Sequence, residues 1–190
     1  MHIRLIRHGT TAGNAARRYV GVSDEPLCPE GRAAAEQKEK DLSLSRVYVS
    51  PLTRARQTAA ILFPHAEQIV VENLHEMDFG AFEGRTADEM ENDPVYRAWV
   101  DDLCRGVCPG GESQADFHAR VGAAFTETVR NAQGDLTFVV HGGVIMSVLW
   151  QFAEPKKDFY DWFAPNLGGY EADVLIRGGA VSLENVRPLP

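Results

Sequence analysis

The sequence predicts an α/β fold, a three-layer sandwich with a mainly parallel central sheet flanked by helices. Short apolar segments that suit buried strands alternate with longer segments of helical periodicity. Three of the strand-like segments lead into histidine or arginine residues, as is typical where parallel strands present side chains to a ligand at one sheet edge. The length of 190 residues suits one domain, and we assign residues 1–190 to it.

The first half of the chain contains three predicted strands and two predicted helices. The strands are expected near residues 2–6, 46–49 and 68–71. The helices are expected at residues 30–42, which are rich in Ala, Glu and Lys, and at residues 51–63. Ser50 is the expected N-cap of the second helix, with Pro51 at its first position. The long polar stretch that ends at Pro29 is interpreted as a functional loop.

The second half begins with an irregular region at residues 73–111, which we expect to form a cap over the sheet edge. Short helical stretches are expected inside it, around residues 87–91 and 95–103. The clearest helical periodicity is that of residues 113–132. The segments expected after it are a strand at 136–140, a helix at 143–152, and two strands at 172–176 and 180–186 joined by a glycine turn.

Composition limits the classes of function. Hydrophobic residues make up 44% and charged residues 24%, as in ordinary globular proteins. The net charge of −8 argues against nucleic acid or an anionic membrane as a partner. Three cysteines are too few for a disulfide framework, and no signal peptide or apolar span is evident. We therefore expect a soluble cytoplasmic protein. Cys104 and Cys108 could form a disulfide or help bind a metal, but no second pair completes a zinc site, and their role is left open.

Basic residues follow three of the predicted strands. Arg7 and His8 come directly after the first strand, and His141 follows the strand that ends at Val140. Arg54 lies in the first turn of the helix that follows the second strand. Because the carboxyl ends of parallel strands lie on one edge, these side chains can converge there. A histidine beside arginines suits a nucleophile beside an anion clamp, so we expect a phosphate ester as the ligand.

The position of Arg54 supports an anion site. A cation in the first turn of a helix is disfavoured by the helix dipole, by about 0.3–1 kcal/mol. The position is favourable if an anion lies beyond the helix start, bound by free backbone N–H groups and the guanidinium together. The alternative is a solvated surface arginine, which fits Arg56 better.

A histidine nucleophile also needs a proton donor for the leaving oxygen. Residues 74–84 offer carboxylates in an apolar loop bounded by glycine, where burial could raise a carboxyl pKa. The candidates are Glu76, Asp78 and Glu83. The residues alone do not choose among them, and any one of them could be a solvated loop charge.

Three blocks of the sequence resemble the histidine phosphatase superfamily, also called phosphoglycerate mutase-like. The first block is Arg7-His8-Gly9, followed by Thr11, Asn14, Arg18, Gly21, Asp24, Pro26-Leu27 and Gly31 at the expected spacing. The other two are Ser50-Pro51-Leu52-Thr53-Arg54-Ala55-Arg56-Gln57-Thr58-Ala59 and Val140-His141-Gly142. The resemblance covers most of the chain.

The resemblance implies roles for the site residues. His8 is the expected nucleophile, and Arg7, Arg54 and His141 are expected to bind the phosphoryl oxygens. Asn14 and the Gly142 amide are expected to assist them. Glu76 matches the acid/base position of the family, and no metal or other cofactor is expected.

The activity implied is hydrolysis of a small phosphorylated metabolite through a phosphohistidine. Residues 78–84 and 109–113 resemble those of small bacterial phosphatases, including α-ribazole phosphatase, so α-ribazole 5'-phosphate is one candidate substrate. The alternatives are a phosphoryl transferase of the phosphoglycerate mutase type and a non-catalytic phosphoester-binding module. The partner expected is the metabolite, without nucleic acid or membrane, and a homodimer is left open.

Overall fold

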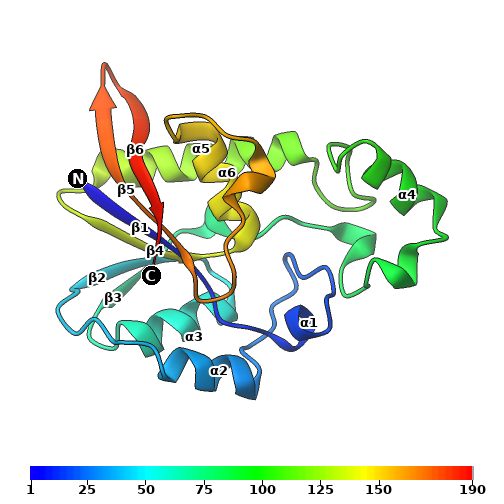
Figure 1. The fold of residues 1–190 in the computed structure, drawn as a ribbon, viewed down its shortest axis with the longest axis horizontal. Helices are drawn as coiled ribbons and strands as arrows, with labels where there is room; N and C mark the ends of the chain where they lie inside the picture. The colour runs from blue at the N-terminus through cyan, green and yellow to red at the C-terminus, as the bar shows by residue number, and fades with distance from the viewer. Residues whose placement is uncertain (190) are drawn as a thin grey trace.

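A mixed sheet of six strands forms the middle layer of the molecule (Figure 1). The computed structural model describes residues 1–189. The strands are β1 (His2–Arg7), β2 (Arg46–Val49), β3 (Glu67–Val70), β4 (Leu136–Val140), β5 (Gly169–Arg177) and β6 (Ala180–Pro188). Their order is β3-β2-β4-β1-β5-β6, in which the first four are parallel and the last two are antiparallel to their neighbours. The predicted fold class is confirmed.

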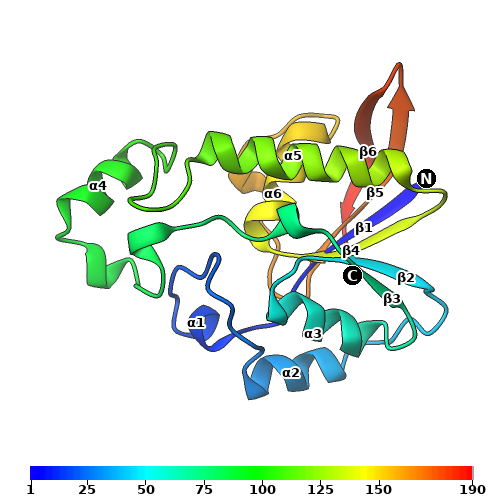
Figure 2. The same cartoon turned by 180° about the vertical axis from the view of Figure 1, so that it is seen from behind.

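Helices cover both faces of the sheet (Figure 2). The helices are α1 (Ala12–Ala15), α2 (Pro29–Glu36), α3 (Thr53–Leu62), α4 (Pro94–Asp101), α5 (Gln114–Asn131) and α6 (Gly142–Phe152). Short 3-10 turns are η1 (Glu72–Leu74), η2 (Gly80–Phe82), η3 (Asp88–Met90) and η4 (Phe159–Trp162). Helices α5 and α6 pack on one face, and α2 and α3 pack on the other. No helix in residues 1–189 has the length and apolar character that crossing a bilayer would require.

Each face of the sheet has its own buried apolar cluster. On the face of α3, Val47 and Val49 pack with Ala55, Ala59 and Leu62. On the face of α5 and α6, the core extends from the sheet to aromatic side chains of the segment between η1 and α5. Strand β4 is buried on both sides, because it lies in the interior of the sheet. This rigid centre fixes the positions at which β1, β2 and β4 end.

Two predicted boundaries were wrong. The helix expected at residues 30–42 ends at Glu36. Although the residues after it favour helix, Asp41 accepts hydrogen bonds from the backbone N–H groups of Ser43 and Leu44 and forms an ion pair with Arg4. These contacts turn the chain toward β2, so the tertiary structure overrides helix propensity.

The helix expected from Pro51 begins two residues later, at Thr53, and its N-cap is Leu52. Ser50 is therefore not the N-cap, and Pro51 is not the first helical residue. The Ser50 hydroxyl instead lies 2.6 Å from Nε2 of His141. The serine thus belongs to the site at the sheet edge.

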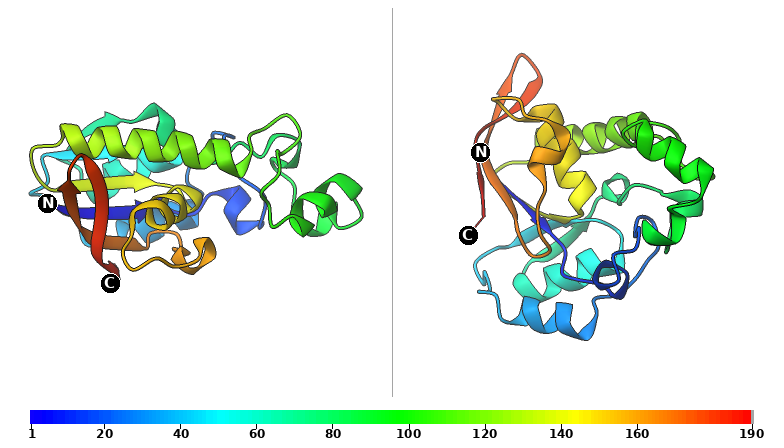
Figure 3. Two further views of the ribbon diagram at one scale, coloured as in Figure 1. Left: turned by 90° about the horizontal axis from the view of Figure 1, so that it is seen from above. Right: turned by 45° about the vertical axis from the view of Figure 1, so that its right-hand side comes forward.

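Several segments pack on neither face of the sheet and lie beyond the carboxyl ends of its parallel strands. Helices α1 and α4 and the loops around them gather there, as the views from above and from the side show (Figure 3). The region 73–111, which we expected to act as a cap, supplies Glu76, Met77, Phe79, Trp99 and Cys104 to the wall of a cavity at this edge. The candidate site is built at the same place.

Candidate active site

His8 lies just after β1, and 3% of its surface is exposed. Its Nδ1 is 2.7 Å from the carbonyl oxygen of Gly9. Because a carbonyl oxygen only accepts hydrogen bonds, Nδ1 carries the ring proton and Nε2 carries the lone pair. Burial and the charge of Arg54 hold the pKa of His8 well below its usual range. The imidazole is therefore neutral near pH 7, and the atom that can act as a nucleophile is Nε2.

Arg54 is fully buried beside His8. Its Nε donates to Nε2 of His8 at 3.2 Å, and its two terminal nitrogens donate to the carbonyl oxygens of Ser23 and Gly21 at 2.7 and 2.6 Å. The solvated alternative is thus excluded for Arg54. The loop that supplies these carbonyls is held in turn by Glu83, whose carboxylate accepts from the backbone N–H groups of Gly21 and Ser23.

One detail of the anion argument was wrong. The N–H of Thr53 at the start of α3 is not free, since the Asp24 carboxylate accepts from the backbone N–H and the hydroxyl of Thr53 at 2.6 and 2.7 Å. The Asp24 carboxylate thus lies at the N-terminal end of α3, where the helix dipole favours a negative charge. The guanidinium of Arg54, and not the helix start, is what faces His8.

His141 follows β4 and is fully buried, with its ring centroid 5.0 Å from that of His8. The Ser50 hydroxyl accepts the backbone N–H of Leu52 at 3.3 Å, so its own proton is available for Nε2 of His141. With the Ser50 proton directed at Nε2, the proton of His141 is on Nδ1, a buried atom that has no hydrogen-bond partner within residues 1–189. Burial holds the pKa of His141 well below its usual range. A donor without a partner beside the nucleophile suits an incoming phosphoryl oxygen.

Arg7 also has a buried nitrogen, Nε, that lacks a partner in the described part of the chain. One terminal nitrogen donates to the carbonyl oxygen of Ala164 at 2.8 Å, which holds the guanidinium in place. A Cβ on Gly142 would lie 3.3 Å from Cζ and Nε of Arg7, so the absence of a side chain lets the guanidinium lie close to the start of α6. Asn14, in α1, lines the same cavity, and its Oδ1 accepts the backbone N–H of Thr11.

Glu76 is the carboxylate that faces this site. Its side chain accepts the backbone N–H groups of Met77 and Gly143 at 3.0 and 2.9 Å, and 8% of the residue is exposed. Burial raises the pKa of Glu76, opposed by these hydrogen bonds and by the charges of Arg54 and Arg7. A carboxyl with a raised pKa is suited to hold a proton near neutral pH.

The other two carboxylates make contacts that hold loops in place. Oδ1 of Asp78 accepts the backbone N–H of Gly80 at 2.9 Å, inside a turn. The Glu83 carboxylate accepts four backbone N–H groups and the Ser23 hydroxyl. Neither residue lines the cavity that contains Glu76 and Arg7. The open choice among the three is thereby reduced to Glu76.

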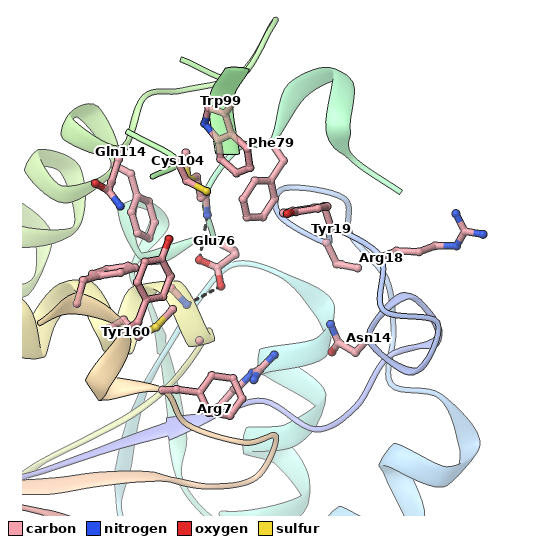
Figure 4. Close-up of a pocket in the computed structure, with 18 residues that line it drawn as sticks. Arg7, Asn14, Arg18, Tyr19, Glu76, Phe79, Trp99, Cys104, Gln114 and Tyr160 are labelled. Atoms are coloured by element: carbon pink, nitrogen blue, oxygen red, sulfur yellow. Dashed lines mark hydrogen bonds between the residues drawn. The ribbon is translucent and has the colours of Figure 1, made fainter. Parts of the chain in front are cut away.

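A cavity of about 330 Å³ is lined by Arg7, Asn14, Glu76 and Gly142, whereas His8, Arg54 and His141 are not among the residues that line it (Figure 4). In Figure 4, Arg7 lies at the bottom, Glu76 lies in the middle, and Phe79 and Trp99 lie at the top. The aromatic residues that line it are Tyr19, Phe79, Trp99, Phe117, Phe159, Tyr160 and Phe163. The cationic side chains that line it are Arg7 and Arg18, and Arg18 is paired with Glu89 at 3.0 Å. The cavity therefore combines one anion-binding end with an uncharged, ring-lined end.

Cys104 and Cys108 are both free thiols. Cys104 lies in the cavity wall, whereas Cys108 is buried, and burial raises the pKa of Cys108 to about 12. A thiol with so high a pKa is protonated near pH 7 and is unreactive.

The model of the histidine phosphatase superfamily, branch 1, matches residues 3–179. The chain belongs to the histidine phosphatase superfamily. The probable phosphoglycerate mutase GpmB of Enterobacter sp. (strain 638) is 31% identical over 156 residues, which cover 78% of this chain and 73% of that protein.

Two solved structures show the same fold. The α-ribazole phosphatase from Shigella flexneri superposes with a TM-score of 0.82 at 24% identity, covering 96% of this chain and 94% of the other. A phosphoglycerate mutase from Thermus thermophilus superposes with a TM-score of 0.71 at 29% identity, covering 91% and 93%. The superfamily includes both phosphatases and mutases, so membership alone does not choose between hydrolysis and transfer.

Several residues of this histidine phosphatase site could not be identified from the sequence. Asn166 donates to the carbonyl oxygen of His8 at 2.9 Å from a loop that carries no recognisable motif. Phe159, Tyr160 and Phe163 reach the cavity from the turn after α6, which was not predicted to have structure. Their aromatic character was the only available signal, because a side chain that closes a cavity from a distant loop leaves no local pattern.

Proposed function

We propose that this histidine phosphatase hydrolyses a phosphomonoester of a small metabolite through a phosphohistidine at His8. The observation that carries the proposal is the placement of His8, whose Nε2 has the lone pair, at the same sheet edge as a buried Glu76 carboxyl that lines the cavity. The buried donors of Arg7, Arg54 and His141 lie around the nucleophile. This arrangement supports in-line attack with charge stabilisation by fixed donors.

In the first step, Nε2 of His8 attacks phosphorus and the bond between phosphorus and the leaving oxygen breaks. Arg54 Nε then turns from the lone pair of His8 to a phosphoryl oxygen, since that lone pair has formed the new bond. Glu76 gives its proton to the leaving oxygen. The products are the alcohol and a phosphohistidine, with the Glu76 carboxylate ionised.

In the second step, water attacks the phosphohistidine and the phosphorus–nitrogen bond breaks. The Glu76 carboxylate takes a proton from this water, which returns Glu76 to its acid form. Inorganic phosphate leaves, and the His8 ring regains its lone pair. The hydrogen bond from Nδ1 to the Gly9 carbonyl keeps the tautomer fixed throughout.

The walls of the cavity favour hydrolysis of an ester with a single phosphate group over mutase-type transfer. A bisphosphorylated intermediate of a glycolytic type carries several anionic groups, and cationic side chains make the strongest hydrogen bonds to such groups. Within residues 1–189, the cavity offers only Arg7 and an Arg18 that is already paired with Glu89. The aromatic walls suit a flat ring on the leaving alcohol. α-Ribazole 5'-phosphate, which the loop motifs also suggest, is the first substrate to test.

The test is a panel of esters followed by ³¹P NMR. The panel contains α-ribazole 5'-phosphate, p-nitrophenyl phosphate, and 3-phosphoglycerate with and without a bisphosphate primer. The proposal predicts inorganic phosphate from the ring-bearing esters and little 2-phosphoglycerate from 3-phosphoglycerate. Rapid transfer after priming would establish a mutase instead, and phosphate binding without turnover of any ester would establish a binding module.

A further inference from the structure

The loop that carries Glu76 has little regular structure of its own. Residues 75–79 lie between the single turns η1 and η2, outside any helix or strand. The Glu76 carboxylate is nevertheless buried, and one of its oxygens accepts the N–H of Gly143 at the start of α6. An irregular segment holds a side chain in place only if its backbone is fixed by neighbours.

Arg120, on α5, supplies this fixation from the opposite side. One terminal nitrogen donates to the carbonyl oxygens of Asn73 and His75 at 2.8 and 3.1 Å. The other donates to the carbonyl oxygen of Glu76 at 3.4 Å and to Oε1 of Glu112 at 2.6 Å. A single guanidinium thus binds three backbone carbonyl groups at and before the proposed acid.

Glu112 completes the arrangement. Its Oε1 accepts the backbone N–H of Asp78 at 3.0 Å, and its own backbone N–H donates to the carbonyl oxygen of Asp78 at 3.0 Å. The backbone N–H of Ala81 donates to the carbonyl oxygen of Pro109 at 2.8 Å. A Cβ on Gly111 would overlap the Asp78 carbonyl oxygen, so only glycine allows this close approach. The segment of residues 109–113 thus lies against residues 78–81, directly after Glu76.

We propose that Arg120 and Glu112 are positioning residues that hold the Glu76 loop so that the carboxyl reaches the leaving oxygen. This inference rests on the proposed function, because it concerns the acid of that reaction. Arg120 fixes the backbone of the loop from α5, and Gly143 fixes the carboxylate from α6. The acid is therefore held between the two helices that cover one face of the sheet.

The chemistry of the pair explains why these residue types are present. Both side chains have 17% of their surface exposed, so an unpaired charge there would be costly. A guanidinium has several donors in a fixed plane, which lets it bind a carboxylate and backbone carbonyls at once. A lysine has a compact ammonium group that cannot reach the same set of acceptors in one position.

The experiment compares two esters in Arg120→Ala, Arg120→Lys and Glu112→Gln. An alkyl phosphate needs a proton on its leaving oxygen, whereas p-nitrophenyl phosphate needs little. The ratio of the two kcat/KM values therefore reports how well the acid is placed, independently of how much protein is folded. Arg130→Ala is the matched control, since Arg130 lies on the same helix and donates to the carbonyl oxygen of Gly179, away from the loop.

For Arg120→Ala we expect the alkyl ester to lose about 10–10²-fold in kcat/KM, while p-nitrophenyl phosphate loses less than about 3-fold. Arg120→Lys and Glu112→Gln should give smaller losses with the same ester preference, and they serve if Arg120→Ala does not fold. Arg130→Ala should leave the ratio unchanged. An equal loss for both esters, or no loss, in the folded variants would overturn the positioning role. If wild type releases phosphate from neither ester, the proposed function itself has failed.

Discussion

Replacing Glu76 by glutamine removes the proposed acid while keeping the size of the side chain. In the structure, the two carboxylate oxygens each accept one backbone N–H, from Met77 and from Gly143. A glutamine amide has one oxygen, so one of these N–H groups would face an NH₂ group instead of an acceptor. We expect a stability loss of about 1–3 kcal/mol from the unsatisfied group, measured by urea unfolding.

The effect on catalysis should depend on the leaving group. General acid catalysis contributes about 10²–10⁴-fold, so an alkyl phosphate should lose that factor in kcat/KM, which corresponds to about 3–5 kcal/mol of barrier. For p-nitrophenyl phosphate, release of the alcohol should be nearly unchanged, but the phosphohistidine should accumulate because no carboxylate is present to activate water. Stopped-flow measurement of nitrophenolate should then show a burst close to one per active site, followed by slow turnover.

The pH dependence of kcat/KM provides a second test of Glu76 as the acid. Because the pKa of Glu76 is raised by burial, the acid form persists to a higher pH than for an exposed glutamate. In wild type, kcat/KM for the alkyl ester should fall as pH rises through this pKa. In Glu76→Gln this decrease at high pH should be absent.

The two neighbouring carboxylates provide control variants. Asp78→Asn should leave kcat/KM nearly unchanged for both esters. Glu83→Gln should lower kcat/KM for both esters by the same factor, because Glu83 holds the loop that binds Arg54. Wild-type rates in Glu76→Gln with both esters would refute the assignment.

The same contacts predict the effects of a glycine substitution, of pH and of chelation. A Cβ on Gly143 would overlap Oε1 of Glu76, so Gly143→Ala should displace the flexible carboxylate and lower alkyl ester hydrolysis by about 10–10²-fold with little loss of stability. Gly134→Ala, where a Cβ meets nothing within 4 Å, is the control, and equal activity in the two variants would contradict the argument. The pKa values of His8 and His141 are well below the ordinary 6.5, so the unfolded chain binds more protons in acid. Stability should be complete above pH 6.5 and should fall as pH drops toward the folded-state pKa values, and a flat urea midpoint across that window would be inconsistent with buried neutral histidines. Activity should survive EDTA, because arginine and histidine donors surround the nucleophile, and loss on chelation with recovery on adding a divalent ion would show a metal requirement.

Much of the fold was predictable because its elements have strong local patterns. The buried strand Leu136–Val140 and the long helix after Ser113 were found to within a residue at each end. The boundaries that failed depend on contacts distant in sequence. After α2 ends at Glu36, Asp41 forms an ion pair with Arg4 in the turn toward β2, and Ser50 is hydrogen-bonded to His141 in the site. Local propensity contains no information about such partners.

The site could be predicted in part for a similar reason. His8, Arg54 and His141 follow parallel strands, so the rule that these strands end at one edge was enough to bring them together. Glu76 and Asp78 lie two residues apart in an irregular loop, where no periodicity distinguishes one side from the other. Local sequence does not separate them. The family resemblance selects Glu76, and in the folded chain it is Glu76 that accepts the N–H of Gly143 and lines the cavity.

The phosphorylated nucleophile is the central claim, and rapid quenching tests it most directly. Wild-type enzyme is mixed with a ³²P-labelled ester, quenched in base within milliseconds, digested, and mapped by mass spectrometry. The account predicts one acid-labile, base-stable phosphoryl group per chain on Nε2 of His8, and none in His8→Ala. A phosphoryl group on serine, aspartate or another histidine, or full turnover by His8→Ala, would contradict it.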